Sequence, residues 1–353
     1  MQIVDFATAH IEQAMQIAKQ NYEDERHHVS ALPPIETVPD LAPYVENGLG
    51  VAAFEGDNMT GFLCAIGPFK NAFRSTDVIG VFSPMGAHGA IGGNRANTYA
   101  YMYQAAGEKW ACAGAASHAV CLYAHEREIQ EQFFRYGFGL RCIDAIRSMN
   151  GVDEPLCEGY EFAELTSDEF IQVLPLVHML DAHMAASPSF ILRPSDTEES
   201  FVNKVRQCHP TILVAKKNGQ IVAYLRAERE GETFLCKMDG YAHVMGAFCL
   251  PEHRGKGLHQ KLLYLMIQNL NAQGYTRFGV DFESINPAAY CFWLKHFDAF
   301  THSVVRRIDE SAVKNRLSTV PCKFVTSYKK RAHKIKQQFY HLQHLKQGVL
   351  QSL

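Results

Sequence analysis

The sequence predicts an α/β protein in which one succession of strands and helices occurs twice. The first observation is a hairpin at residues 211–226, where two apolar runs flank Asn218-Gly219, a pair typical of tight turns between strands. The second is an apolar strand ending near Leu250, which passes through a short glycine turn into an amphipathic helix. The third is that residues 1–152 repeat the element order of residues 158–310, which indicates a duplicated unit.

The composition is that of a folded globular protein with more than one domain. The chain has 353 residues, of which 47% are hydrophobic and 20% charged, and its formal net charge is -3. This length predicts two domains, and the charge balance lacks the basic excess of a nucleic-acid binder. Because no apolar run is long enough to span a bilayer and the N-terminus lacks signal-peptide features, we expect a cytoplasmic protein without membrane contact.

Cysteine and histidine are both common, but neither forms a metal motif. The ten cysteines occur singly, without a Cys-x-x-Cys pair, which predicts reduced thiols rather than a zinc or redox site. The seventeen histidines are scattered and lack the helical spacing of zinc hydrolases. We therefore expect no metal.

The second half gives the clearer element pattern, because its hydrophobic periodicity changes at recognisable turn and cap residues. Leu258, Leu262, Leu265 and Leu270 recur at helical spacing, and Gly274 is placed to end that helix. The expected order is strand 161–165, helices 168–184 and 199–208, hairpin 211–226, strand 244–250, helix from 258, strand 278–282, helix 287–296 and strand 303–308.

The first half follows the same order with strand 3–6, helices 10–22 and 41–47, and a hairpin over residues 51–66. Residues 79–89 resemble residues 245–255, but the basic glycine turn of the second half is replaced by His88 and a run of glycines. Arg95 is the nearby permanent cation in this copy. We therefore expect the first copy to bind anions more weakly than the second and to be a degenerate copy that shapes the site of the second.

The glycine turn at residues 254–257 has the features of an anion site. Gly255 and Gly257 allow the backbone to approach a ligand closely, and the amide groups at the start of the next helix can face phosphate oxygens. Arg254 and Lys256 add positive charge. The alternative is a solvated basic turn without a ligand.

Arg254, with Gly257 three residues later and His259 five residues later, resembles the Arg/Gln-x-x-Gly-x-Gly/Ala signature of the GNAT acyltransferase superfamily. The resemblance implies two tandem GNAT-type domains at residues 1–152 and 158–310. Each is expected to have a mixed, mostly antiparallel central sheet with helices on both faces. A helical tail is expected over residues 311–353, where Tyr340, Leu342, Leu345 and Leu350 suggest an amphipathic helix that packs on a domain or on a second subunit.

The same resemblance implies a coenzyme A site in the second domain. The diphosphate is expected at the turn and the first residues of the helix, and the pantetheine arm is expected to pair with the strand before them. Asn286 begins a segment that resembles the one lying along the pantetheine in this family, although it suits a helix cap equally well. The implied cofactor-binding residues are Phe248, Cys249, Leu250, Arg254, Gly255, Lys256, Gly257, Leu258, His259, Asn286 and Trp293.

Two positions depart from the family pattern. His259 is bulky where the family has Gly or Ala, and Trp293 stands where the family has its usual acid, a tyrosine. An indole N–H cannot release a proton near neutral pH, so Tyr290, one helical turn earlier, is the candidate acid. Glu283 is the candidate base, with His243 as a further option. A packing aromatic and a solvated carboxylate remain the alternatives for Tyr290 and Glu283.

The sequence therefore predicts an acetyl-CoA-dependent N-acyltransferase that acts on the amine of a small molecule or peptide. The acidic residues 23–25 are placed to attract a cationic amine, unless they form a solvated helix end. The alternative is that the protein binds acyl-CoA without catalysis or acts as a regulatory protein. This alternative is suggested by His259 and Trp293, which depart from the family pattern at the cofactor site and at the acid position. The sequence leaves open whether the protein forms a homodimer.

Overall fold

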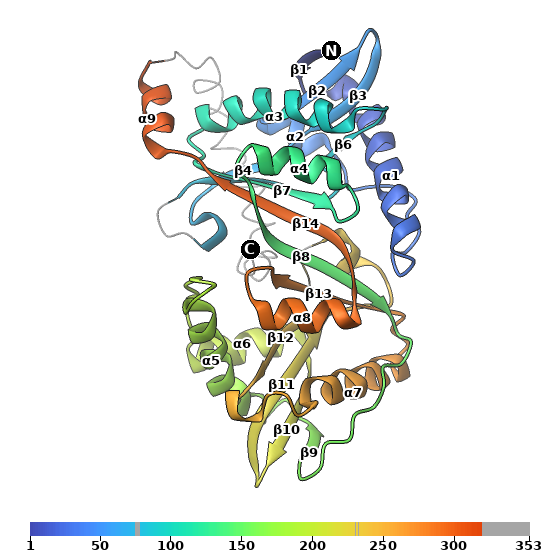
Figure 1. Ribbon diagram of the computed structural model, residues 1–353, viewed down its shortest axis with the longest axis vertical. Coiled ribbons are helices and arrows are strands. Elements are labelled where there is room, and N and C mark those ends of the chain that lie inside the picture. Colours follow the sequence, from blue (N-terminus) through green and yellow to red (C-terminus); the bar gives the residue numbers. More distant parts are fainter. Residues whose placement is uncertain (75–77, 230, 232, 320–353) are drawn as a thin grey trace. The chain divides into compact units, whose positions relative to one another are not determined.

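The computed structural model describes residues 1–74, 78–229, 231 and 233–319. The chain folds into two compact units (Figure 1). The first comprises Met1–Ile143 and Ala299–Leu353, and the second comprises Asp144–Asp298.

The first unit contains two sheets. Strands β1, β2, β3 and β6 form one in that order, and β4, β5, β7, β14 and β8 follow one another in the other. Its elements are β1 Gln2–Asp5, α1 Ile11–His28, α2 Ala42–Asn47, β2 Val51–Glu55, β3 Asn58–Leu63, β4 Ile66–Phe69, β5 Gly80–Ser83, β6 His88–Ala90, α3 Arg95–Cys112, β7 Ser117–Tyr123, α4 Arg127–Arg135, β8 Gly139–Ser148, β14 Asp298–Arg307 and α9 Glu310–Thr319.

An aromatic core holds α3 and α4 against the first unit's strands. Trp110 is fully buried and lies in one cluster with Tyr103, Phe133 and Phe138, whose rings meet mostly edge to face. The Trp110 indole N–H donates a hydrogen bond to the Leu49 carbonyl, so the polar atom of this large side chain is satisfied.

The second unit has one sheet, in which β8 is followed by β13, β12, β11, β10 and β9. The hairpin β10–β11 turns at Asn218 and Gly219, both with positive φ, as its sequence predicts. The elements are β9 Glu161–Glu164, α5 Leu174–Ala185, α6 Glu198–Cys208, β10 Thr211–Lys217, β11 Gln220–Glu228, β12 Tyr241–Cys249, α7 Leu258–Ala272, β13 Arg277–Glu283 and α8 Pro287–His296.

Helices cover both faces of this second sheet. Helices α5 and α6 share a buried cluster with Ile212, Val214, Tyr224 and Phe248. Neighbouring strand residues such as Leu213 are buried too and point to the opposite face, where α7 packs on β10 and β11. The predicted mixed sheet with helices on both faces is confirmed.

The last strand of each sequence repeat lies next to a strand of the other repeat. β14, the last strand of the second repeat, pairs antiparallel with β7 of the first unit, from Thr301–Tyr123 to Arg307–Ser117. β8, the last strand of the first repeat, begins in the first unit and its final residues belong to the second, where β13 is its neighbour. The packing units therefore differ from the sequence repeats, 1–152 and 158–310, at both ends of the second repeat.

Most elements lie close to their predicted positions, but β14 begins at Asp298 rather than at residue 303, and α5 begins at Leu174 after a short 3-10 helix at Phe170–Val173 rather than at residue 168. Helix α1 continues past residue 22 to His28, because Tyr22 and Glu25 turn inward and are buried. Residues 88–90, at the position of the basic glycine turn of the second half, form the buried strand β6. Helix α9 is present, whereas the helix expected from Tyr340 to Leu350 lies outside the described residues.

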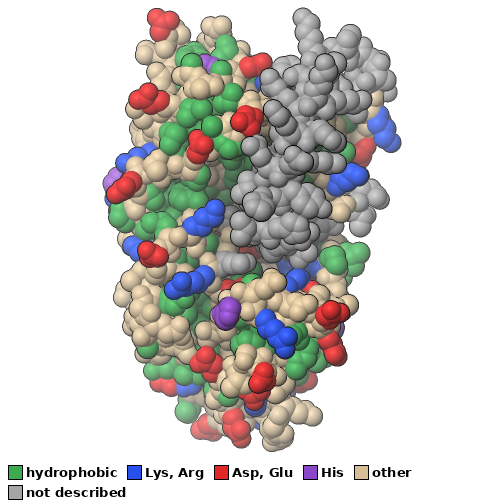
Figure 2. Space-filling view, turned by 180° about the vertical axis from the view of Figure 1, so that it is seen from behind, with side chains coloured by type: hydrophobic (Ala, Val, Ile, Leu, Met, Phe, Trp, Pro, Cys, Tyr) green, Lys and Arg blue, Asp and Glu red, His purple; other side chains and the backbone are tan. Residues whose placement is uncertain are grey.

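Acidic and basic side chains are interspersed over the described surface in Figure 2, in agreement with a net charge near zero. Among the described residues, none of the helices combines the length and the apolar character needed to cross a membrane.

Candidate cofactor site in the second unit

The sheet of the second unit opens between β12 and β13. The parallel pairing of these strands starts at Tyr241–Arg277 and ends at Val244–Val280. Both strands continue beyond this point, β12 to Cys249 and β13 to Glu283. The side of residues 245–249 that faces β13 thus has no strand partner in the described register, and we call it the open edge.

The groups at the open edge follow from the pairing of β12 with β11. The Leu250 N–H donates to the Val222 carbonyl on β11 at 2.9 Å. In an antiparallel pair, residues that face the partner strand alternate with residues that face away. Leu250 and Phe248 therefore face β11, and the N–H and C=O groups of Cys249 and Ala247 face the open edge.

This geometry changes which backbone groups can meet a ligand. The sequence places Phe248 and Leu250 at the ligand and misses Ala247, because the register between β11 and β12 cannot be read from a single strand. A β-bulge between Arg226 and Ala227 shifts that register within the same pair.

Arg254 is hydrogen-bonded to one backbone group of the open edge. Its Nε donates a hydrogen bond to the Cys249 carbonyl at 3.0 Å, and its guanidinium lies 5.4 Å from the centre of the Phe248 ring. Arg254 is nevertheless exposed, so it can turn toward a ligand at the cost of this hydrogen bond.

The glycine turn leads into a helix start without a side-chain cap. Gly255 and Gly257 have φ of +74° and +73°, a region that favours glycine. Gly257 is the N-cap of α7 and has no side chain to accept from the first amide groups of the helix. Leu258 anchors the helix start in the core, and Lys256 is exposed. Uncapped N–H groups beside two cations suit an anion such as a diphosphate.

The segment before β9 packs on the same turn. Cys157 Sγ lies 3.4 Å from the Lys256 carbonyl, and a Cβ on Gly257 would come within 3.2 Å of Pro155. Lys261 on the first turns of α7 pairs with Glu154. The conformation of the turn is therefore fixed from one side by residues 153–157.

His259 reaches from α7 to the backbone of β12. Its imidazole hydrogen-bonds to the Phe248 carbonyl, while its Nε2 is buried and has no hydrogen-bond partner among the described residues. Burial lowers the pKa of His259 to about 4, and the charge of Arg254 acts in the same direction. The ring is thus neutral at pH 7.

Asn286 caps α8. Its side chain accepts from the Ala289 N–H at 3.4 Å, and its Nδ2 lies 3.6 Å from the Met184 sulfur on α5. The cap role is therefore present in the structure, and the weak sulfur contact leaves the amide group able to bind a better acceptor.

The two aromatic residues of α8 differ in exposure. Tyr290 is 42% exposed and packs its ring against Phe282 on β13. Trp293 is buried against Phe292 and Phe297. Of the two, Tyr290 has the hydroxyl and the access that an acid needs.

Carboxylates and a histidine gather where β12 and β13 separate. His243 Nε2 lies 2.8 Å from Asp281 Oδ1. Burial disfavours the charged imidazole, but Cys236 and the bond to Asp281 raise the pKa of His243 well above its usual value. Glu283, two residues beyond Asp281 on the same side of β13, is buried as well.

This geometry agrees with a family match. The model of the acetyltransferase (GNAT) family matches residues 177–298, which include the open edge, the glycine turn, α7 and α8. These residues form a GNAT domain. The match ends at Asp298, where β14 begins.

Solved structures with the GNAT fold resemble most of the chain. A GCN5-related N-acetyltransferase from Sphaerobacter thermophilus superimposes with a TM-score of 0.54 at 12% identity, over 87% of this chain and 95% of its own. A tandem GNAT protein from the clavulanic acid biosynthesis pathway covers 87% of this chain and 98% of its own, at 11% identity and a TM-score of 0.45. No curated protein matches the chain in sequence.

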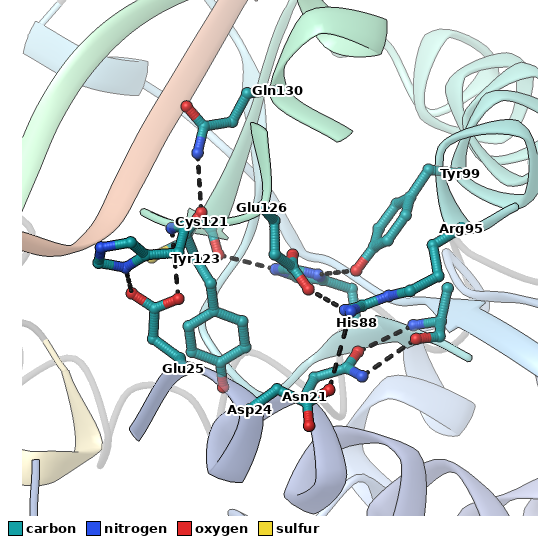
Figure 3. A network of polar contacts seen from close by, with 12 residues as sticks. Asn21, Asp24, Glu25, His88, Arg95, Tyr99, Cys121, Tyr123, Glu126 and Gln130 are labelled. Carbon is teal, nitrogen blue, oxygen red and sulfur yellow. Dashed lines mark hydrogen bonds and ion pairs between the residues drawn. The ribbon is translucent and has the colours of Figure 1, made fainter. Parts of the chain in front are cut away.

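The first unit repeats the GNAT element order but fills the corresponding gap with side chains. The parallel pairing of β5 with β7 ends at Ser83–Val120. Just beyond, His88 on β6 bonds to the Cys121 carbonyl on β7 and to the Tyr99 hydroxyl on α3 (Figure 3). This arrangement differs from the open edge of the GNAT domain in the second unit.

Around His88, the first unit has a network of polar contacts, in which His88 and Glu25 are buried and Asp24 and His125 are exposed (Figure 3). Glu25 accepts from the backbone N–H and the ring of His125, and burial raises the pKa of this carboxyl despite the opposing effect of His125. Arg95 pairs with Glu126 and with Asp24. The acidic residues 23–25 are thus not a uniform solvated helix end.

Other candidate sites are less developed. Within the described residues, no group of three or more His, Cys, Asp or Glu side chains is placed to hold a metal ion. A cavity of about 340 Å³ next to α6 is lined by Asp168, Phe170, Glu198, Val202 and Arg206 among others, and none of the predicted site residues lines it.

Proposed function

We propose that the protein transfers an acetyl group from acetyl-CoA to the amine of a small molecule or peptide, and that the GNAT domain of the second unit carries out this reaction. The observation that carries the proposal is the open edge of β12, which ends at an uncapped helix start flanked by Arg254 and Lys256. An extended arm with an anionic end fits such a combination, since strand addition uses backbone groups and a helix start binds phosphate.

The residues present fit coenzyme A in two respects. The amide groups from Gly255 to His259 lie at the turn and helix start, with Arg254 and Lys256 beside them. The open edge offers the backbone of Ala247 and, once Arg254 releases it, the Cys249 carbonyl. Asn286 would add its amide group from the start of α8.

The chemistry requires a neutral amine, donors for the developing oxyanion and a proton for the leaving thiolate. Acetyl-CoA supplies the thioester whose carbonyl carbon forms the new C–N bond as its C–S bond breaks. The Ala247 N–H at the open edge would donate to the developing oxyanion. Glu283 would take the amine proton, and the exposed Tyr290 hydroxyl would protonate the thiolate.

The acceptor would approach from the α5 side of the sheet. Asp281 and Glu283 lie on one side of β13, and Met184 at the end of α5 contacts Asn286. A cationic amine is attracted by carboxylates, and Glu283 would then remove its proton. This supports an amine as the acceptor class.

The alternative is a coenzyme A-binding protein without turnover. It is favoured by the burial of Trp293 at the family's acid position and by His259, which reaches the β12 backbone. Both functions share the cofactor site, so binding and turnover must be measured separately.

The first experiment is calorimetric titration of acetyl-CoA into the intact chain and into the Arg254→Ala, Lys256→Ala variant. Loss of two phosphate partners should weaken binding at least tenfold. The matched control is Lys204→Ala, Arg206→Ala on α6, which removes the same charge from the same unit and should bind like wild type. Absence of binding by the wild-type chain would refute both functions.

Turnover distinguishes the two functions. Thiol release from acetyl-CoA is followed over a panel of primary amines with wild type and Glu283→Gln. Amine-dependent release that falls at least 100-fold in the variant supports catalysis with Glu283 as base. Tight binding without amine-dependent release supports the non-catalytic function.

A further inference from the structure

A ring contact spans the gap beside the open edge. His259 is the second residue of α7, the helix that follows β12, and Phe292 belongs to α8, which follows β13. Their ring centres lie 5.7 Å apart. Because the two strands separate after Val244 and Val280, this contact joins the two sides of the opening.

His259 also binds the strand itself. Its imidazole hydrogen-bonds to the Phe248 carbonyl, next to the open edge, and the ring therefore extends from the β12 backbone to α8. Arg254 holds the adjacent Cys249 carbonyl. An arm that pairs with the open edge has to displace Arg254 from the Cys249 carbonyl, and an arm that enters between β12 and β13 has to pass the contact of His259 with Phe292.

The buried Nε2 of His259 makes the resting position unfavourable for a histidine. This atom has no hydrogen-bond partner among the described residues, and an unpaired buried nitrogen costs free energy. Displacement would return this atom to water or to a phosphate, which offsets the loss of the Phe248 bond.

We propose that His259 is a proton-linked gate of the cofactor groove: it closes the groove against Phe292 as a neutral ring, and on coenzyme A binding it leaves the Phe248 carbonyl, turns to the diphosphate and binds a proton. The inference rests on the proposed function, because it concerns the same groove.

The proton linkage follows from the two environments of the ring. In the closed position burial lowers the pKa of His259 to about 4, so the ring is neutral. Beside a diphosphate its pKa returns to at least the ordinary value of about 6.5, so binding takes up a proton below that pH. Arg254 is the charged group that acts on the ring in the closed position. The turn, β12, α7 and α8 carry further titratable groups, which include Glu252, His253, Lys256, Cys249, Lys261, Tyr290, Cys291, Lys295 and His296.

The test measures proton uptake directly. Coenzyme A is titrated calorimetrically into the full chain in two buffers of different ionisation enthalpy, from pH 5.5 to pH 8. For wild type we expect net uptake near pH 6 and about tenfold tighter binding at pH 5.5 than at pH 7.5. His259→Ala should lose this imidazole contribution and, because nothing closes the groove, bind about fivefold tighter than wild type at pH 8.

The controls separate the gate from the rest of the site. His253→Asn changes another histidine of the same loop, whose ring is bonded to Tyr160, and should keep the wild-type proton uptake. Phe292→Ala should speed association while keeping the uptake. Melting curves establish that each variant folds. Equal uptake in wild type and His259→Ala, or weaker binding by that variant at pH 8, would overturn the gate while the proposed function stands; no binding by any protein would refute the function itself.

Discussion

His88 Nε2 lies 2.8 Å from the Cys121 carbonyl oxygen, just beyond Ser83–Val120, where the parallel pairing of β5 with β7 ends. Its other ring nitrogen lies 2.8 Å from the Tyr99 hydroxyl. One buried side chain thus bonds to the strand opposite the unpaired end of β5, where an added arm would lie. This is the physical basis for expecting the first unit to take no coenzyme A.

Buried neutral histidines make the first unit sensitive to acid. Burial lowers the pKa of His88 and of His118 to about 4. Between pH 6.5 and pH 4 the unfolded chain binds protons that the folded chain does not, so stability falls as pH falls through this range. Each of these two histidines should lower the free energy of unfolding by about 2 kcal/mol when the pH falls from 7.5 to 5. Urea unfolding of wild type and His88→Gln at both pH values checks this, and an unchanged pH dependence in the variant would contradict it.

Removal of the hydroxyl from two buried tyrosines of the first unit should have different effects on the stability of the protein. The Tyr123 hydroxyl is buried without a partner among the described residues, whereas the Tyr22 hydroxyl donates to the Pro33 carbonyl at 2.6 Å. Tyr123→Phe should leave stability unchanged or raise it, and Tyr22→Phe should cost about 1 kcal/mol. Denaturant midpoints measure both, and a larger loss for Tyr123→Phe would show that its hydroxyl is bonded in solution.

The two glycines of the turn form a matched pair. Gly255 and Gly257 have nearly the same positive φ, but a Cβ on Gly255 meets open space, whereas one on Gly257 would come within 3.2 Å of Pro155. Alanine at either position should cost about 1 kcal/mol from backbone strain, with a further loss at Gly257. Thermal unfolding compares the variants. Equal losses would mean that the Pro155 segment moves away freely.

Variants of Asn286 separate its two roles. Asn286→Ala removes the cap of α8 and should cost about 1 kcal/mol of stability. Asn286→Ser keeps a capping oxygen but lacks the amide group, so it should retain most of the stability. If the amide contacts the pantetheine, the serine variant binds acetyl-CoA several-fold more weakly, as calorimetry would show; unchanged affinity would assign Asn286 to the cap alone.

The local elements and their order follow from the sequence alone. Asn218-Gly219 specifies a tight hairpin because both residues accept positive φ. In the same way, Gly255 and Gly257 accept the positive φ that the turn before α7 requires. Helix 287–296 begins and ends as predicted, because Asn286 and Pro287 favour a helix start and the extended Phe297 ends it. These features depend on residues close together in the chain.

The contacts between distant parts of the chain depend on how the strands pair and the helices pack. Strand pairing turns Ala247 rather than Phe248 to the open edge, because a shift of one residue reverses every backbone group. The pairing of β14 with β7, the inward turn of Glu25 to His125 and the contact of His259 with Phe292 join residues far apart in sequence. Such contacts depend on register and packing, which hydrophobic periodicity along one chain does not specify.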